Sequence, residues 1–250
     1  MPKEDLQVNI DPQEMLEAGT HFGHRISASH PKMVPFVFGT RNNVYLIDPE
    51  KSAEKLKEAL QYIQGLVAEN KTLLLVGTKI QIKKLVKETA ETCLIPYVCE
   101  RWLGGTFTNF EVIKKRIDYF KDLKKQKAEG QLEKYTKKER LKIDREIQGL
   151  EERLGGIENM EKLPEAIFVC DIKKDNIAIR EAKQKKVKVI GLADTNIDPS
   201  LADYPIPAND DAISSVRYIL NKVKETIFNA KSKIQSAKSL PETDQPQPNK

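Results

Sequence analysis

Short apolar runs alternate along this 250-residue chain with longer segments of helical periodicity. The runs that indicate strands cover residues 43–48, 72–78, 96–100, 166–171 and 187–194. The run TLLLVGT (72–78) is continuously apolar and bounded by turn residues, which is typical of a strand buried on both faces of a parallel sheet.

The segments beside these runs carry apolar residues at helical spacing. Leu56, Leu60, Ile63 and Val67 fall on one stripe of the segment 49–70. Further helices are predicted over residues 11–19, 79–93, 176–186 and 210–228. The alternation of strand and helix indicates βαβ units, so the predicted fold class is α/β, with a doubly wound, mostly parallel sheet of the Rossmann or flavodoxin type.

One segment breaks the alternation, because no strand pattern occurs between Gly105 and Gly155. Apolar residues recur there at heptad spacing in two groups, Phe110, Ile113, Ile117 and Phe120, and then Ile143, Ile147, Leu150 and Leu154. The pairs Thr108 with Glu111 and Thr136 with Glu139 match the capping box that begins a helix. We therefore expect an inserted antiparallel two-helix coiled-coil hairpin that turns around Gly130.

These patterns divide the chain into parts. Residues 1–103 form the first part of the α/β domain with an N-terminal helix, 104–157 form the hairpin, and 158–229 form the second part of the α/β domain. Residues 230–250 are rich in Pro, Gln, Ser and Lys and lack apolar periodicity, so a disordered tail is predicted there.

The stretch RWLGGTFTNF (101–110) poses a choice between a phosphate-binding loop and a structural junction. A phosphate fingerprint requires GxGxxG or GxxxxGK[ST] between a strand and a helix, and neither is present. The expected role is a packing junction at the base of the hairpin, formed by Trp102, Gly104, Gly105, Gly155 and Gly156. The segment VGTK (76–79) is a weaker candidate for anion binding and is more simply an ordinary strand-to-helix turn.

Two polar clusters are candidates for chemistry. The segment HFGH (21–24) is either a tight packing turn or a source of a metal ligand. Asp194 ends a predicted strand, whereas Asp210 and Asp211 open the last predicted helix, where they are suited to cap it. Because strand ends of a parallel sheet meet at one edge, His24 with Asp194, Asp210 or Asp211 is also a candidate site for a divalent cation, zinc or magnesium.

Charge adds a candidate binding surface. Charged residues make up 32% of the chain, and its net charge is +5. The excess of basic over acidic residues is concentrated in the hairpin, where it suits phosphate contacts, although a solvated coiled-coil surface is the plain alternative. The candidate RNA-binding residues are Lys114, Lys115, Arg116, Lys121, Lys124, Lys125, Lys137, Lys138 and Arg140 on the hairpin, with Arg25, Lys32, Arg41 and Arg101 outside it.

Other features narrow the class of protein. Cys93, Cys99 and Cys170 lack the spacing of a disulfide framework or a metal site, so we expect buried thiols in a reducing compartment. No apolar run is long enough for a membrane span, and the N-terminus lacks the apolar core of a signal peptide. No nucleophile elbow is found, so no enzyme, required cofactor or small-molecule substrate is predicted.

Taken together, several motifs resemble one family, the bacterial-type small-subunit ribosomal protein S-two family. They are HFGH (21–24), PKM (31–33), FGTRNNVYLID (38–48), LLLVGTK (73–79), RWLGGTFTNF (101–110), LGGIENMEKLPEAIFVCD (154–171), ADTNIDP (193–199) and YPIPANDDAI (204–213). Residues 27–30 (SASH) depart from the basic, Trp-containing stretch common there, and Ala208 replaces the family's usual glycine.

The resemblance implies a non-enzymatic structural constituent of the small ribosomal subunit, acting in translation in the cytoplasm. Its implied partners are small-subunit rRNA and neighbouring ribosomal proteins, including the mRNA-binding protein S-one, which it would help to dock. The alternatives that the residues leave open are an α/β enzyme that binds a nucleotide or small molecule, and a coiled-coil scaffold for protein interaction.

Overall fold

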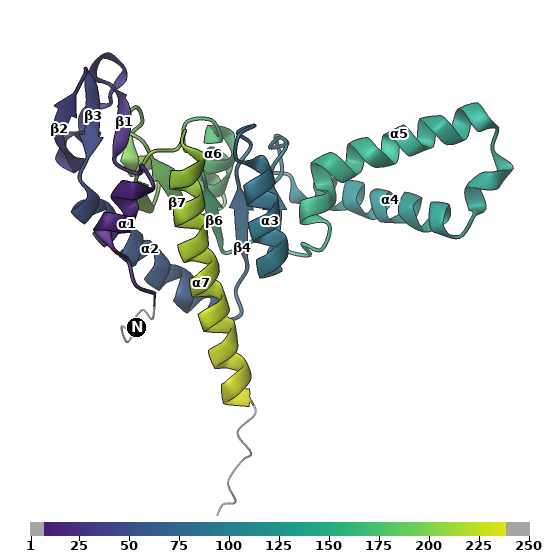
Figure 1. Ribbon diagram of the computed structural model, residues 1–250. Helices are drawn as coiled ribbons and strands as arrows, with labels where there is room; N and C mark the ends of the chain where they lie inside the picture. The colour runs from purple at the N-terminus through teal and green to yellow at the C-terminus, as the bar shows by residue number, and fades with distance from the viewer. Residues whose placement is uncertain (1–7, 239–250) are drawn as a thin grey trace, which may run out of the picture.

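A five-stranded parallel sheet forms the centre of the body in this computed structural model, which describes residues 8–238 (Figure 1). The strands lie in the order β5-β4-β6-β7-β8. Their bounds are β4 (Leu73–Val76), β5 (Tyr97–Val98), β6 (Ala166–Val169), β7 (Lys188–Ala193) and β8 (Tyr204–Pro207). This is the flavodoxin-like strand order. The second strand, β5, is added on one side of the first strand, β4, and all later strands are added on the other side.

Both faces of this sheet are buried, as the continuous apolar runs predict. On β4, Leu73 and Leu75 belong to one hydrophobic cluster, whereas Leu74 and Val76 belong to the other. The first cluster is covered by α1 (Pro12–Glu17), α2 (Pro49–Ala68), α3 (Lys83–Cys93) and α7 (Ile213–Lys238). The second contains α6 (Asn176–Gln184) and the base of the hairpin, so helices cover both faces.

A second, smaller sheet corrects two predictions. It is antiparallel, in the order β1-β3-β2, with β1 (Phe22–Arg25), β2 (Val37–Arg41) and β3 (Val44–Ile47). The predicted strand at 43–48 is therefore outside the parallel sheet, and HFGH forms strand β1 rather than a tight turn. Asn42 and Asn43 between β2 and β3 both have positive φ (50° and 61°), as in a two-residue hairpin turn, which makes antiparallel pairing the local solution.

Helices α4 (Phe110–Ala128) and α5 (Lys137–Leu154) project from the body (Figure 1). We call residues 110–154 the arm. Phe120, Leu123 and Ile147 are buried between the two helices, with Ile143 and Leu150 packed against them. Apolar spacing therefore produces the helix pairing, whereas supercoiling of the two helices stays a prediction.

Several helix ends differ from the predictions, and α7 begins at Ile213 rather than at the predicted residue 210. The capping box of Thr136 and Glu139 is confirmed, but α4 begins after Asn109 without a side-chain cap. The helix predicted from residue 79 begins at Lys83, since residues 79–82 form a turn. Helix α7 continues to Lys238, so the predicted disordered tail is wrong over 230–238, and its remainder lies outside the described residues. Buried Ala230 and a hydrogen bond from Lys231 Nζ to the carbonyl of Cys93 attach this extension to the body.

Over the described part of the chain, none of the helices combines the length and the apolar character that a membrane-spanning segment requires.

Candidate functional site

The base of the arm is organised around one buried carboxylate. Glu181 on α6 is 8% exposed and accepts hydrogen bonds from the backbone N–H groups of Gly105 (2.8 Å), Phe107 (2.9 Å) and Thr108 (3.2 Å). The indole N–H of Trp102 donates to the same carboxylate at 3.3 Å. Burial alone would raise the pKa of Glu181, but these donors outweigh it and lower the pKa below its usual value.

The predicted packing junction agrees with this arrangement at Trp102. Its ring is 6% exposed and meets the ring of Phe107 edge to face, with centroids 5.0 Å apart. Gly105 has a φ of +92°, which favours glycine, and a Cβ on Gly156 would lie 2.2 Å from the carbonyl oxygen of Tyr97. Gly104 has open space around it, and Gly155 faces Glu151, so no comparable demand for glycine exists there.

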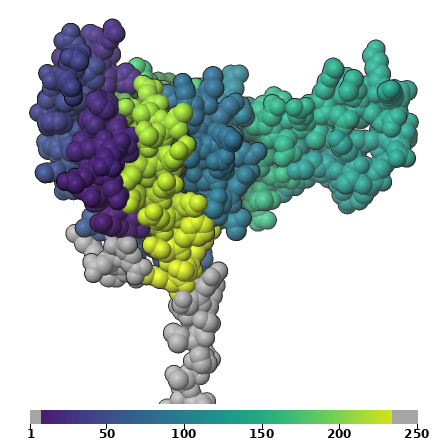
Figure 2. All heavy atoms as spheres, viewed as in Figure 1, coloured from purple at the N-terminus to yellow at the C-terminus, as the bar shows by residue number. Residues whose placement is uncertain are grey.

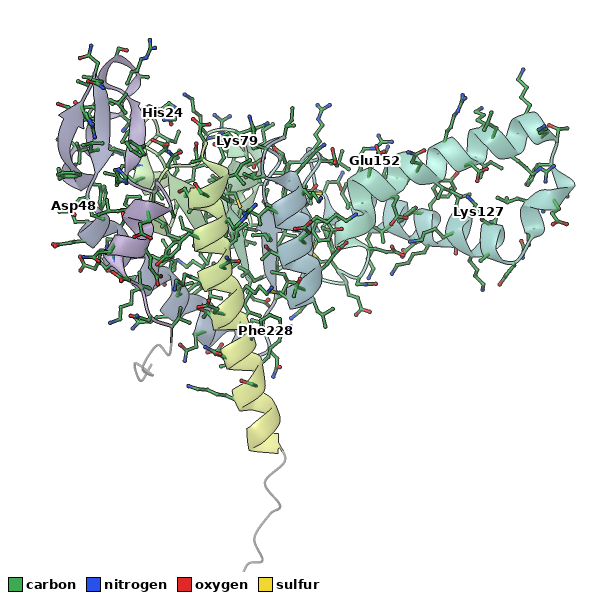
Figure 3. All side chains as sticks on the ribbon, in the orientation of Figure 1. His24, Asp48, Lys79, Lys127, Glu152 and Phe228 are labelled. Atoms are coloured by element: carbon green, nitrogen blue, oxygen red, sulfur yellow. The ribbon has the colours of Figure 1, made fainter. Side chains whose placement is uncertain are left out.

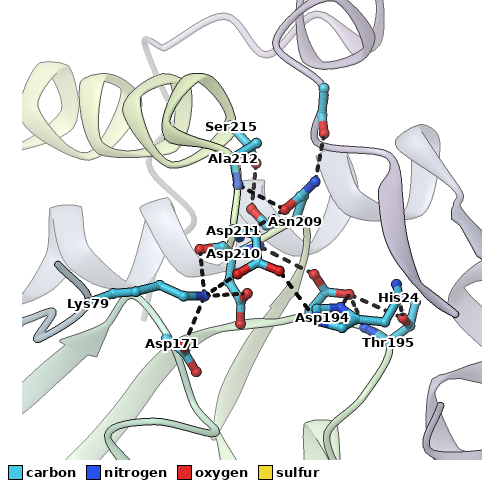
Figure 4. A network of polar contacts seen from close by, with 11 residues as sticks. His24, Lys79, Asp171, Asp194, Thr195, Asn209, Asp210, Asp211, Ala212 and Ser215 are labelled. Atoms are coloured by element: carbon cyan, nitrogen blue, oxygen red, sulfur yellow. Dashed lines mark hydrogen bonds and ion pairs between the residues drawn. The ribbon is translucent and has the colours of Figure 1, made fainter. Parts of the chain in front are cut away.

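The carboxyl edge of the parallel sheet holds a second network, which we call the rim network (Figure 4). Lys79 follows β4, and its Nζ lies 3.0 Å from Asp171, 2.9 Å from Asp210 and 2.8 Å from Asp211. Asp171 follows β6, so this ammonium connects the ends of β4 and β6. These two strands flank the topological switch point, where the order of strand addition reverses. In doubly wound folds this is the position of ligand-binding crevices. In this protein the ion pairs of Lys79 connect the two sides of that crevice.

VGTK uses its backbone within the protein as well. The N–H of Thr78 donates to Asp175 at 3.2 Å, and its hydroxyl donates to the same carboxylate at 2.7 Å. The candidate anion of this turn is therefore a carboxylate of the chain itself, which agrees with an ordinary strand-to-helix turn.

His24 extends the rim network toward the small sheet (Figure 4). Its Nδ1 lies 3.0 Å from Asp194, and its Nε2 lies 3.4 Å from Asp211. The backbone N–H of His24 donates to Thr195 Oγ1 at 2.7 Å. Contact with Asp194 is the main reason that the pKa of His24 is raised above its usual value.

The acidic residues before α7 do not act as the predicted caps. Asn209 Oδ1 accepts from the N–H groups of Asp211 (2.8 Å) and Ala212 (3.0 Å), which leaves the Asp210 and Asp211 carboxylates for Lys79. Asp210 is 4% exposed, and burial together with the carboxylates of Asp171 and Asp194 raises its pKa to about 7.

The structure brings the four candidate metal ligands, His24, Asp194, Asp210 and Asp211, into one network. Within residues 8–238, however, no group of three or more His, Cys, Asp or Glu side chains has an arrangement that could hold a metal ion. The ammonium of Lys79 already contacts the carboxylates of Asp171, Asp210 and Asp211. The donor types suit a cation, but their arrangement does not fit one.

The arm carries the largest group of candidate RNA-binding residues, and ion pairs divide that group. Lys124 lies 3.3 Å from Glu151 and 3.0 Å from Glu158, and Lys125 lies 3.9 Å from Glu129. Lys127, an arm lysine outside that group that is labelled in Figure 3, pairs with Asp144 at 2.7 Å. In contrast, the following exposed candidates have no ion pair among the described residues: Lys114, Lys115, Arg116, Lys121, Lys137, Lys138 and Arg140.

The candidates outside the arm divide in the same way. Lys32 lies 2.6 Å from Asp198 and is neutralised by it. Arg25 and Arg41 are exposed on the small sheet, and Arg101 is exposed at the base of the arm. These three arginines have no ion pair in the described part of the chain. Figure 2 shows the arm and the small sheet at opposite ends of the molecule, so the free basic charges occupy separate places.

A family model for ribosomal protein S2 matches residues 15–230 of the 250. The chain belongs to the ribosomal protein S2 family. This confirms the S-two resemblance and makes the chain a structural protein of the small ribosomal subunit, acting in translation. The ribosomal protein S2 family is not an enzyme family, so its membership argues against the alternative of an α/β enzyme.

Two side chains at the centre of these networks escape prediction from sequence. Glu181 falls beside the buried residues Ala178 and Ala182 on α6, and a carboxylate on an apolar helix face is the signal that could have found it. Lys79 is predicted only as the end of the VGTK turn and the first residue of a helix, and no local pattern indicates its carboxylate partners. Of these, Asp210 and Asp211 are more than a hundred residues away.

Proposed function

We propose that this member of the ribosomal protein S2 family binds small-subunit rRNA through the free basic residues of its arm. The observation that carries the proposal is the separation of charges: arm residues such as Lys114, Lys115 and Arg116 have no ion-pair partner among the described residues. Phosphate contacts by Lys and Arg release counterions, and a lysine already paired with a carboxylate gains less from such a contact.

Binding of the full chain to purified small-subunit rRNA, measured over a range of salt concentrations, tests the proposal. The variant Lys114→Ala/Lys115→Ala/Arg116→Ala is expected to bind more weakly. The slope of log affinity against log salt should become shallower by roughly 0.9 for each duplex phosphate that the variant no longer neutralises.

A matched control is available on α3. Lys83, Lys84 and Lys87 are paired with Glu100, Glu88 and Glu91, so their triple alanine variant has the same change in net charge without removing free arm charges. The control should keep the wild-type slope. Equal slopes for all three proteins would show that the arm charges are merely solvated.

We also propose that the protein resides in cytoplasmic small subunits and helps to dock ribosomal protein S1 there. Family membership supports the first part, and the S-two resemblance supports the second. Subunits prepared without this chain should retain less S1 after sedimentation, and adding the purified chain should restore it. Full retention of S1 without the chain would contradict the docking role.

A divalent cation, zinc or magnesium, held by His24 with Asp194, Asp210 or Asp211 stays a separate proposal. It rests on the donor types and requires Lys79 to move. Elemental analysis of the purified wild type beside Asp194→Ala tests it. Stoichiometric metal that disappears in the variant would support the site, and absence from both proteins would reject it.

A further inference from the structure

The small sheet exposes aromatic and apolar side chains that its size does not explain. Phe22 on β1 is 44% exposed, and Phe38 on β2 is 59% exposed. Ile26 and Val34, in two short 3-10 helices between these strands, are also exposed, at 40% and 56%. A cluster of exposed apolar residues on one small unit indicates a binding surface more than scattered single residues do.

Strand register shows which residues share a face. Phe22 on β1 and Gly39 on β2 both pair with Leu46 on β3, so these residues point the same way. Arg25 and Arg41 both pair with Val44, two residues from Leu46, and therefore lie on that face too. We call this face, with Phe22, Arg25 and Arg41, the outward face.

The opposite face is turned toward the body. Ile47 is fully buried there, and a Cβ on Gly23 would lie 2.5 Å from Thr195 Cγ2. Gly23 is the neighbour of Phe22, and adjacent residues in a strand point to opposite faces. The exposure of Phe22 therefore follows from the packing of Gly23 on the body.

The segment around the outward face is purely basic. No Asp or Glu occurs between Glu17 and Asp48 of a chain that has 37 acidic residues. The charges in this interval are Arg25, Lys32 and Arg41, and Lys32 is paired with Asp198. Arg25 and Arg41, on the two edge strands of the small sheet, have no ion-pair partner within the described residues. The face therefore attracts an anion.

Phe22 is also held in position. The ring of His21 lies against it with centroids 3.9 Å apart, and the carbonyl of His21 accepts a hydrogen bond from the N–H of Ile47 at 2.8 Å. An aromatic ring fixed in this way loses little conformational freedom when a flat partner stacks on it.

We propose that the outward face binds a single-stranded segment of RNA, with a base stacked on Phe22 and phosphates contacted by Arg25 and Arg41. A base paired within a helix offers no free face, so stacking on a side chain requires a single strand, loop or bulge. The inference rests on the proposed function of rRNA binding, and it adds a second contact at the opposite end of the molecule from the arm (Figure 1).

Fluorescence anisotropy of the full chain with a short labelled oligouridine tests the proposal. Phe22→Ala should weaken binding between about fivefold and 150-fold without changing the salt slope, because stacking releases no counterions. Phe22→Trp should restore binding, whereas Phe22→Leu, which keeps an apolar side chain without a π face, should not. Arg25→Ala/Arg41→Ala should make the slope shallower by about 1.4, that is, 0.7 for each single-strand contact.

Two results would overturn the inference: wild-type protein that does not bind oligouridine at low salt, or equal binding by Phe22→Leu and wild type. Phe22 is exposed, so unchanged thermal unfolding of its variants serves as the folding check. The arm triple variant separates the two proposals. If it lowers the rRNA salt slope while Phe22→Ala binds oligouridine normally, the outward-face proposal alone fails. If Phe22→Ala weakens oligouridine binding while the arm variant matches wild type on rRNA, the arm proposal alone fails.

Discussion

Lysines in the rim network and on the arm have opposite environments. The side chain of Lys79 is 14% exposed and lies within 3.0 Å of three carboxylates, whereas Lys114 and Lys115 are exposed and have no ion pair among the described residues. Because Lys79 is buried and paired with carboxylates, its charge is not available to a binding partner. The difference teaches that a count of basic residues does not locate a binding surface, because only unpaired charges are available to a partner.

The largest expected effect is at the base of the arm, which joins the arm to the body. Trp102→Ala should lower the free energy of unfolding by about 3–5 kcal/mol, because the indole is 6% exposed and packs on Phe107. Urea unfolding followed by far-UV circular dichroism measures this loss. Val112→Ala, at a 46% exposed position on α4, is the control and should change little. A loss below about 1 kcal/mol for Trp102→Ala would contradict tight packing at this base.

Removing the central charge of the rim network should cost nearly as much. Lys79→Met keeps much of the side-chain volume but leaves the carboxylates of Asp171 and Asp210 buried without their cation, at a cost of about 3 kcal/mol. Proton uptake by Asp210 limits the loss, since its pKa is already raised to about 7. Urea unfolding above neutral pH tests this. An unchanged free energy of unfolding in Lys79→Met would mean that water reaches the carboxylates.

The raised pKa of Asp210 predicts a pH dependence of stability. A carboxyl group with a higher pKa in the folded state binds more protons there than when unfolded, so its contribution falls as pH rises from 3.8 toward about 7. The stability of wild type relative to Asp210→Asn should therefore decrease over this interval. Urea unfolding of both proteins at pH values of about 4 and about 7 measures this difference in the free energy of unfolding. A difference that is the same at both pH values would contradict the raised pKa of Asp210.

The smallest effects on stability are expected on the arm, where one paired lysine and one unpaired lysine can be compared. Lys124→Ala should cost up to about 1 kcal/mol, since Lys124 pairs with Glu151 and Glu158. Lys121→Ala should stay within about 0.5 kcal/mol. Their order in RNA binding should be reversed, with the larger loss at Lys121. An equal cost in stability at both positions would remove the distinction between paired and free charges.

Elements with strong internal periodicity are predictable from sequence. The run Leu73–Val76 can satisfy its apolar side chains only between two layers, and the spacing from Phe110 to Phe120 can form a stripe only on a helix. The main strands and the helices of the arm therefore follow from local pattern.

Features that depend on distant partners are not predictable in this way. Strand–helix alternation assigns residues 43–48 to the wrong sheet, because it outweighs the hairpin signal of Asn42-Asn43. The capping role expected of Asp210 and Asp211 belongs to Asn209, since Lys79 draws the carboxylates away. His24 and Asp194 do lie in contact, as the grouping of HFGH with the edge of the parallel sheet predicts, although His24 lies on a strand of the small sheet and not on a turn.

The position of the arm within the sheet also has a consequence for the order of folding. Strands β4 and β6 are neighbours, as in the pair Leu73 and Ala166, although the whole arm lies between them in sequence. Closing so long a loop costs chain entropy. When α4 and α5 pair first, they bring Phe110 and Leu154 into one cluster and leave a much shorter path to close. We expect amides of the arm to gain protection from hydrogen exchange before those of β6 during refolding, and earlier protection of β6 would contradict this. Early pairing of α4 with α5 thus offsets most of the loop length that the insertion adds between β4 and β6.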